Sequence, residues 1–386
     1  MAQFRKALSA QTLFTPLVTM LIAAGLSACG GGDGNTTPKT AISRVKVMGD
    51  SLADSGTYGF KFTVQDPSNP KGFPTWPEKI TATYGAPALC NVFQFNGTSF
   101  TEPAAGCTNY AVGGATINNP AAKGGAAVPS SILMQIKTAG NVGFSASELL
   151  LIDGGGNDAA DLIGAYLAAS RDSGAALVTL TTTLLPLATV QTTLSQPDGA
   201  AALGSLYMSA LADKFASEIS SNLLEKGATR IAIMNMPTVS NTPKIGIAFG
   251  RIATAKGGGE AGAQAVAAAK VVFDTWVKAF NNQLALKFAG NGAVTIADFG
   301  TTLANQVADP APYGLTNSTA AACPSTGTSA TGAPTYSLKT CLSTALDTSN
   351  PTWKTHAFAD DFHPTPYGHQ FLAQLITIEL AKKGWL

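Results

Sequence analysis

Short apolar runs alternate with long helical stretches along this chain, and this alternation limits the possible folds more than any other feature. Four runs are short and apolar enough to be buried strands: 44–48, 148–153, 230–234 and 294–298. Three longer stretches carry apolar residues at helical spacing: 203–226, 261–288 and 366–383. Strands separated by helices of this length predict a parallel sheet covered on both faces.

Three stretches between these elements show neither period and are expected to be long loops: 60–108, 116–145 and 301–357. Loops of that length usually serve a function or are held down by cross-links. The chain has no internal repeat and no interdomain linker. Residues 42–386 are therefore expected to form one domain.

The first 28 residues have the pattern of an export signal. Arg5 and Lys6 precede an apolar stretch too short for a comfortable membrane span, which ends in Leu26-Ser27-Ala28-Cys29. This ending resembles a bacterial lipobox, so we expect a lipoprotein-type signal peptide at 1–28 and lipidation of Cys29. The alternative is an ordinary signal peptide cut after Ala28, without a lipid.

Residues 29–41 are rich in glycine and predict a flexible tether. A tether after a lipidated cysteine would hold a folded domain away from a membrane. Gly30 stands where an aspartate would retain a lipoprotein at the inner membrane, so an outer-membrane or cell-surface location is expected. A periplasmic or secreted protein is the alternative.

The charge balance excludes one class of partner. The formal net charge is +1 for the whole chain, and without residues 1–28 it becomes −1, with 22 Lys and Arg against 23 Asp and Glu. Such a balance gives no basic face, so nucleic acid is not an expected partner.

Four cysteines besides Cys29 agree with export, and they allow three disulfide pairings. We favour Cys90–Cys107 and Cys323–Cys341, because each pair closes a short loop and the pairs lie far apart in the sequence. No C-x-x-C and no flanking histidine pair is present, so no metal site is expected.

Four short polar and glycine-rich blocks follow one another along the chain. They are Gly49-Asp50-Ser51-Leu52, Gly113-Gly114, Gly155-Gly156-Asn157-Asp158 and Asp360-Asp361-Phe362-His363. The first and third directly follow expected strands, and open α/β sheets place their chemistry at the carboxyl ends of strands. A serine after such a strand can act as a nucleophile or merely cap a helix.

Ester hydrolysis needs a nucleophile, a base and a group that orients the base. Ser51 is the candidate nucleophile. His363 is the candidate base, because His356 and His369 have no acid three residues before them. Asp360 is the expected orienting carboxylate, and its neighbour Asp361 is the competitor for that role.

The four blocks resemble those of the SGNH (GDSL) hydrolase superfamily, and they bracket nearly all of the chain after the signal. The resemblance implies a three-layer α/β/α sandwich with a central parallel sheet, flavodoxin-like in plan. It also implies Ser51, Asp360 and His363 as catalytic residues and an oxyanion hole formed by the Ser51 N–H, the Gly114 N–H and the Asn157 amide. Gly113 is the alternative to Gly114. No cofactor is expected.

The same resemblance implies a serine esterase that hydrolyses carboxylic esters through an acyl-Ser51 intermediate, with short to medium acyl chains preferred. The alternatives are a phospholipase, lipase or glycerolipid acyltransferase of the superfamily, a carbohydrate deacetylase, and an inactive surface-binding module. For the deacetylase, Trp76, Tyr84 and Phe95 could stack on sugars. The expected partners are an ester or lipid substrate and, through the anchor, a membrane.

Residues 173–197 carry no charged side chain. Two interpretations remain open at this point: a helical hairpin packed on the domain, or an exposed apolar flap near the active site.

Overall fold

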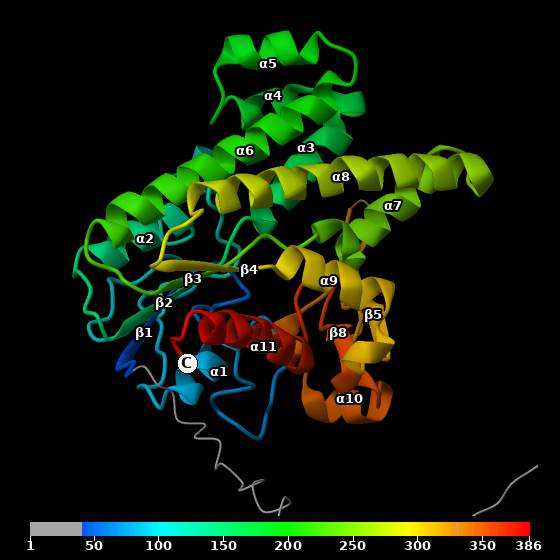
Figure 1. Ribbon diagram of the computed structural model, residues 1–386. Coiled ribbons are helices and arrows are strands. Elements are labelled where there is room, and N and C mark those ends of the chain that lie inside the picture. Colours follow the sequence, from blue (N-terminus) through cyan, green and yellow to red (C-terminus); the bar gives the residue numbers. More distant parts are fainter. Residues whose placement is uncertain (1–40, 331) are drawn as a thin grey trace, which may run out of the picture. The chain divides into compact units, whose positions relative to one another are not determined.

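A four-stranded parallel sheet lies at the centre of the fold (Figure 1). The structure is a computed structural model that describes residues 41–330 and 332–386. The strands adjoin in the order β1 (Arg44–Met48), β2 (Glu148–Ile152), β3 (Ile231–Met234) and β4 (Val294–Ala297). The four expected strands are confirmed to within one residue at each end. The expected signal peptide, Cys29 and most of the tether lie outside the described residues.

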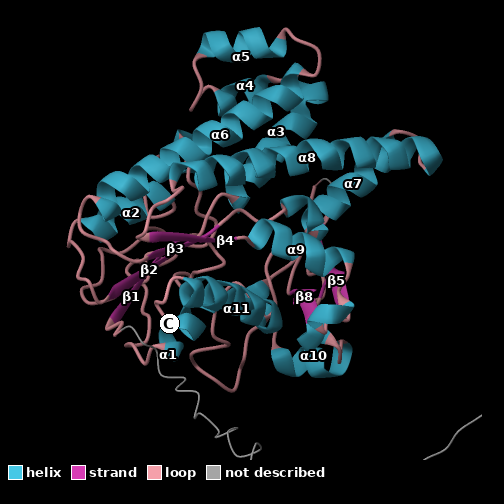
Figure 2. Cartoon of the chain, viewed as in Figure 1, coloured by secondary structure: helices cyan, strands magenta, loops and turns pink. Residues whose placement is uncertain are grey.

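Strand side chains alternate between two hydrophobic layers, as the period of a strand requires. One layer contains Leu150, Ile152 and Ile233 and lies under α6 and α8, and the other contains Leu149 and Leu151 and lies against α1 and α11. Every residue of β2 is buried. The predicted three-layer α/β/α sandwich with a parallel sheet is therefore confirmed (Figure 2).

Helices cover both faces of the sheet (Figure 1). The described residues form α1 (Trp76–Thr83), α2 (Ile132–Gly140), α3 (Gly156–Asp172), α4 (Ala175–Thr181), α5 (Leu187–Leu194), α6 (Gly199–Ile219), α7 (Pro243–Ala255), α8 (Gly259–Lys287), α9 (Phe299–Ala308), α10 (Ser343–Ser349) and α11 (Pro366–Lys382). A π-helical turn, Ser220–Leu224, continues α6. The three long helices expected from the sequence correspond to α6 with this turn, α8 and α11.

Two small sheets lie outside the central one. β5 (Asn317–Ala321) pairs in parallel with β8 (His356–Phe358), and β6 (Gly327–Thr328) pairs with β7 (Pro334–Thr335). The first pair matters for function, because the chain leaves β8 and reaches Asp360 two residues later.

The three expected loops are more ordered than predicted. They contain α1, α2, α10 and most of α9, as well as β5 and β8. The start of α1 had a recognisable signal, because Thr75 and Glu78 form a capping box there and Pro77 occupies the first turn. At the end of the first stretch, the chain also passes beside β1, where the Val47 N–H donates to the Thr108 carbonyl at 2.9 Å.

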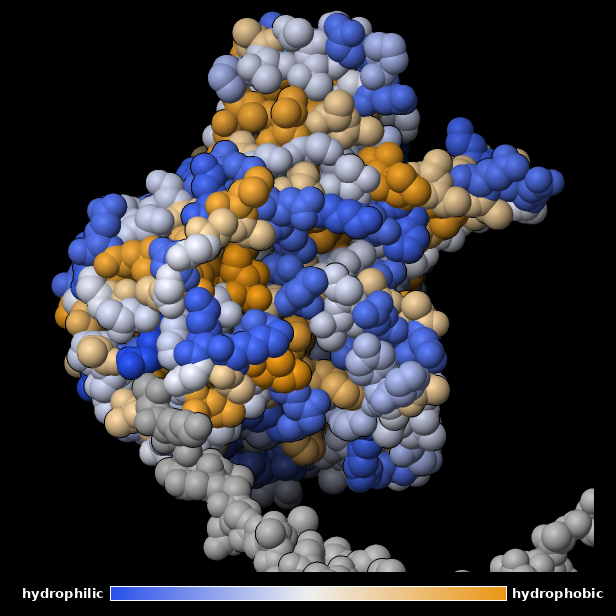
Figure 3. Space-filling view, viewed as in Figure 1, coloured by the Kyte–Doolittle hydropathy of each residue, from blue (hydrophilic) through white to orange (hydrophobic). Residues whose placement is uncertain are grey.

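The uncharged stretch at 173–197 forms a helical hairpin of α4 and α5. It packs on the domain through Leu177 and Val190, which are both buried. Figure 3 shows apolar residues gathered around α4. No residue of either helix lines the pocket beside Ser51, so the hairpin interpretation holds and the flap interpretation is wrong.

Both predicted disulfides, Cys90–Cys107 and Cys323–Cys341, are present. The second supports the segment before Asp360, because the Cys323 N–H donates to the Ala359 carbonyl at 2.8 Å. Within residues 41–330 and 332–386, no helix has both the length and the apolar character needed to cross a bilayer.

Candidate active site

Ser51 lies just beyond the carboxyl end of β1, where the chain turns tightly. Gly49 allows this turn, because a Cβ there would lie 1.7 Å from the Asp153 Oδ1. That carboxylate oxygen accepts the Asp50 N–H at 2.9 Å, and the Gly49 N–H donates to the Gln135 side chain at 2.8 Å. Side chains from α2 and from the end of β2 thus fix the turn. Ser51 itself is only 3% exposed.

His363 reaches Ser51 from the far end of the chain. Its Nδ1 lies 2.8 Å from Asp360 Oδ2, and its Nε2 lies 2.9 Å from Ser51 Oγ. An ionised carboxylate can only accept, so the ring proton is on Nδ1 and Nε2 accepts from the Ser51 hydroxyl. The structure therefore brings together Asp360, His363 and Ser51, the three residues predicted to be catalytic.

The loop that carries His363 is held by its own aspartate. Asp360 Oδ1 accepts the backbone N–H groups of Phe362 and His363 at 2.8 and 2.6 Å. Among the described residues, the Asp361 side chain makes no hydrogen bond to His363, and its backbone carbonyl accepts the Lys244 N–H at 2.8 Å. Asp360, not Asp361, is the carboxylate positioned to orient the imidazole.

Burial and charge act in opposite directions on this pair. Burial disfavours the imidazolium form of His363, but the charge and hydrogen bond of Asp360, together with the charge of Asp50, outweigh burial, and the pKa of His363 is raised. Burial would likewise raise the pKa of Asp360, but His363 and the two backbone N–H groups together lower it. Asp360 is therefore ionised at neutral pH and stabilises a proton on His363.

Two backbone N–H groups in the first two polar blocks are free to donate. Among the described residues, neither the Ser51 N–H nor the Gly114 N–H has a hydrogen-bond partner. Gly114 is exposed and adopts a φ of 75°, a conformation that glycine tolerates. The Gly113 N–H is occupied, since it donates to Asp54 Oδ2 at 2.9 Å.

Asn157 lies in the first turn of α3, where the helix dipole favours negative charge. Its side-chain amide donates one hydrogen to the Ala115 carbonyl at 2.9 Å, which turns the group toward the loop that bears Gly114. The amide has a second N–H to offer. The Asn157 side chain and the Gly114 N–H are thus tied to the same loop.

The buried side chains of Asp54 and Asp158 hold the loop that bears Gly114. Asp54 accepts the N–H groups of Gly56, Thr57 and Gly113. Asp158 accepts those of Ile117 and Asn118 at 2.9 and 2.8 Å, and burial raises its pKa to about 7. Asp54 and Asp158 therefore hold loops in place.

Asp50 and Asp153 form a second buried pair of acids beneath Ser51. Burial raises the pKa of Asp50 to about 6, and burial together with Asp50 raises the pKa of Asp153 well above its usual value. Asp153 Oδ2 also lies 3.3 Å from the Trp76 indole nitrogen, which donates to it. Trp76 is therefore a buried structural residue, and the sugar-stacking role considered for it is wrong.

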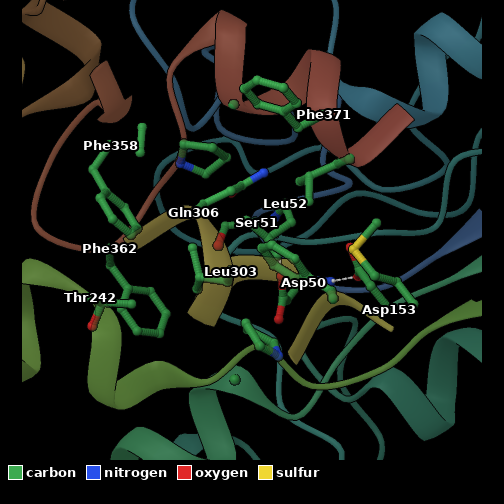
Figure 4. A pocket seen from close by; sticks show the side chains of 18 of the residues that line it. Asp50, Ser51, Leu52, Asp153, Thr242, Leu303, Gln306, Phe358, Phe362 and Phe371 are labelled. Carbon is green, nitrogen blue, oxygen red and sulfur yellow. Dashed lines mark hydrogen bonds between the residues drawn. The ribbon is translucent and has the colours of Figure 1, made fainter. Parts of the chain in front are cut away.

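A narrow pocket opens beside Ser51 and Phe362 and extends between α9 and α11 (Figure 4). Its walls are mostly apolar, and its free volume is about 40 Å³. The lining side chains include Leu52, Phe299, Leu303, Gln306, Phe358, Phe362, Phe371 and Leu372.

Sequence reasoning missed four residues of the site. Asp153 had a signal, since it directly follows a buried strand. Phe62, Gln135 and Gln306 had none. The Phe62 ring lies 5.1 Å from the His363 ring, and it occupies the space that a Cβ on Gly113 would need.

Among the described residues, no group of three His, Cys, Asp or Glu side chains is arranged to hold a metal ion. Comparison with curated proteins finds no match. A family model described as GDSL-like Lipase/Acylhydrolase matches residues 45–376. This match covers most of the chain and includes all four polar blocks, so the chain belongs to the GDSL-like lipase/acylhydrolase family.

Proposed function

We propose that this chain is a serine esterase that hydrolyses carboxylic esters through an acyl-Ser51 intermediate. The observation that carries the proposal is the continuous line of hydrogen bonds from Asp360 through His363 to Ser51. Family membership supports a hydrolase of ester substrates.

In the first half of the reaction, Ser51 Oγ attacks the ester carbonyl carbon and its proton passes to His363 Nε2. Asp360 stabilises the resulting imidazolium, in keeping with the raised pKa of His363. The tetrahedral intermediate then expels the alcohol, which takes the proton from Nε2. Ser51 is left as an ester of the acyl group.

The negative charge on the carbonyl oxygen is assigned to three donors: the Ser51 N–H, the Gly114 N–H and the Asn157 side-chain amide. Two of them have no protein partner among the described residues. Preorganised donors of this kind contribute on the order of 10²–10³ each in rate. Water then attacks the acyl-Ser51 ester with His363 as base, and the enzyme is regenerated.

The pocket favours short acyl chains. A single water needs at least roughly 10–15 Å³, so a free volume of about 40 Å³ holds a few heavy atoms. This size supports esterase activity on acetate-to-butyrate esters over the lipase, phospholipase and acyltransferase alternatives. A deacetylase acting on acetylated sugars would also fit an acyl pocket of this size.

The test is hydrolysis of p-nitrophenyl esters from acetate to palmitate, together with phosphatidylcholine and an acetylated sugar. We expect turnover that is highest for the short esters and absent in Ser51→Ala. Ser55→Ala is the matched control, because Ser55 lies in the same block but only accepts a hydrogen bond from Asn109. No turnover of any ester, or full turnover in Ser51→Ala, would contradict the proposal.

A further inference from the structure

One buried polar side chain in the pocket is explained neither by packing nor by the hydrolytic mechanism. Gln306 is 5% exposed and lines the pocket from α9 (Figure 4). Phe299 and Leu303 lie seven and three residues before Gln306, on the same helix face, and line the same pocket. Gln306 therefore adds a polar group to a mostly apolar wall.

The Gln306 amide has no hydrogen-bond partner among residues 41–330 and 332–386. Gln135 provides the contrast: it is also buried, but it donates to the Pro129 carbonyl and accepts the Gly49 N–H. The Gln306 amide is not among the buried unsatisfied atoms, so water can reach it. A plain acyl chain that displaces this water leaves the amide unpaired, at a cost on the order of 1–3 kcal/mol, whereas a group that pairs with Gln306 avoids that cost.

The pocket suits the acyl part of an ester better than the alcohol part. The alcohol leaves after the first half of the reaction, whereas the acyl group stays on Ser51 Oγ, and Ser51 lines the pocket. A narrow pocket next to Ser51 therefore fits the part of the substrate that remains covalently bound.

A primary amide presents one acceptor oxygen and two N–H donors. The smallest group that can both donate and accept is a hydroxyl, which suits a pocket with a free volume of about 40 Å³. A keto oxygen could pair with the N–H but would leave the amide oxygen unpaired.

We propose that the pocket selects esters of short hydroxy acids, with Gln306 as the specificity-determining residue that binds the acyl hydroxyl. This inference rests on the esterase function proposed above. It concerns substrate choice alone, because Gln306 takes no part in bond making or breaking.

The test compares ethyl butanoate with ethyl 2-hydroxybutanoate and ethyl 3-hydroxybutanoate, with acid release followed by pH-stat. We expect kcat/KM of the wild type to be at least about tenfold higher for one hydroxy ester than for the plain ester. In Gln306→Leu that preference should disappear, because the hydroxy ester loses its partner and the plain ester does not.

Gln374→Leu is the matched control, since Gln374 is exposed on α11 and lies outside the pocket. It should leave both kcat/KM values unchanged. Gln306→Leu should fold with a Tm close to that of the wild type, because it replaces an amide that makes no protein hydrogen bond by an apolar group of similar size.

The outcomes separate the two proposals. If wild type and Gln306→Leu both hydrolyse the esters with the same ratio of kcat/KM, the hydroxy-acid inference is overturned and the esterase function stands. If the wild type hydrolyses none of the esters, the esterase function fails and the inference fails with it.

Discussion

Asp360 and Asp361 are adjacent in the sequence, yet the fold gives them different surroundings. Asp360 bonds the imidazole of His363 and two backbone N–H groups, and its pKa is lowered despite burial. The pKa of Asp361 is raised by burial and by the neighbouring Asp360 charge. Only Asp360 is therefore positioned to stabilise the protonated form of His363.

We therefore expect Asp360→Asn to lower kcat by about 10²–10⁴-fold and Asp361→Asn to change it by less than about threefold. Asparagine cannot stabilise the imidazolium that forms when Ser51 is deprotonated. Initial rates on p-nitrophenyl butyrate measure both effects, with circular dichroism as a check of folding.

The pH profile of the same variants separates an effect of Asp360 on His363 from an effect on the stability of the fold. His363 must be neutral to act as a base, so kcat/KM falls as the pH drops through its raised pKa, above 6.5. Removing the Asp360 charge removes the main cause that raises this pKa, so the acid limb should move to lower pH. A limb that stays in place in Asp360→Asn, or an equal loss in Asp361→Asn, would refute the assigned role.

At the scale of elements, α9 shapes the pocket that we propose holds the acyl group. Its residues Phe299, Leu303 and Gln306 line this pocket together with Phe371 and Leu372 of α11. In this proposal, the two helices set how many carbon atoms can follow the ester carbonyl. Chain-length preference should therefore respond to single residues on α9.

Leu303→Ala should shift the preferred acyl chain toward longer esters by two carbon atoms or more, because it removes a side chain that closes the pocket. It should also destabilise the fold by about 2–5 kcal/mol, as buried leucines generally do when truncated. Rates across the p-nitrophenyl ester series measure the shift.

Leu380→Ala serves as the comparison, since Leu380 is buried on the same side of the sheet but does not line the pocket. It should cost similar stability and leave the preferred chain length unchanged. If Leu303→Ala keeps the wild-type preference, the pocket between α9 and α11 does not hold the acyl chain.

At the scale of the whole molecule, the sheet and the Ser51–His363–Asp360 line could be predicted, because their signals are local. A buried strand shows as an apolar run, and each polar block is contiguous in the sequence. Both disulfides were predictable for the same reason, since each closes a loop of 17 or 18 residues.

The pocket could not be predicted, because it is assembled from segments that lie far apart in the sequence. Nothing in the sequence distinguishes Gln306 from an exposed glutamine on a helix, and Phe62 lies in a segment without regular structure. Asp153 and the capping box at Thr75 and Glu78 did have local signals. Asp153 was missed because it was read only as the end of a strand. The capping box was missed because residues 60–108 were interpreted as a long loop.

The central claim is that Ser51 is a nucleophile activated by His363. The most direct measurement is covalent labelling with a fluorophosphonate, followed by peptide mass spectrometry. The account predicts a single adduct on Ser51 whose rate of formation falls by at least about 10²-fold in His363→Ala. An adduct on another residue, or equally fast labelling of Ser51 without His363, would contradict it.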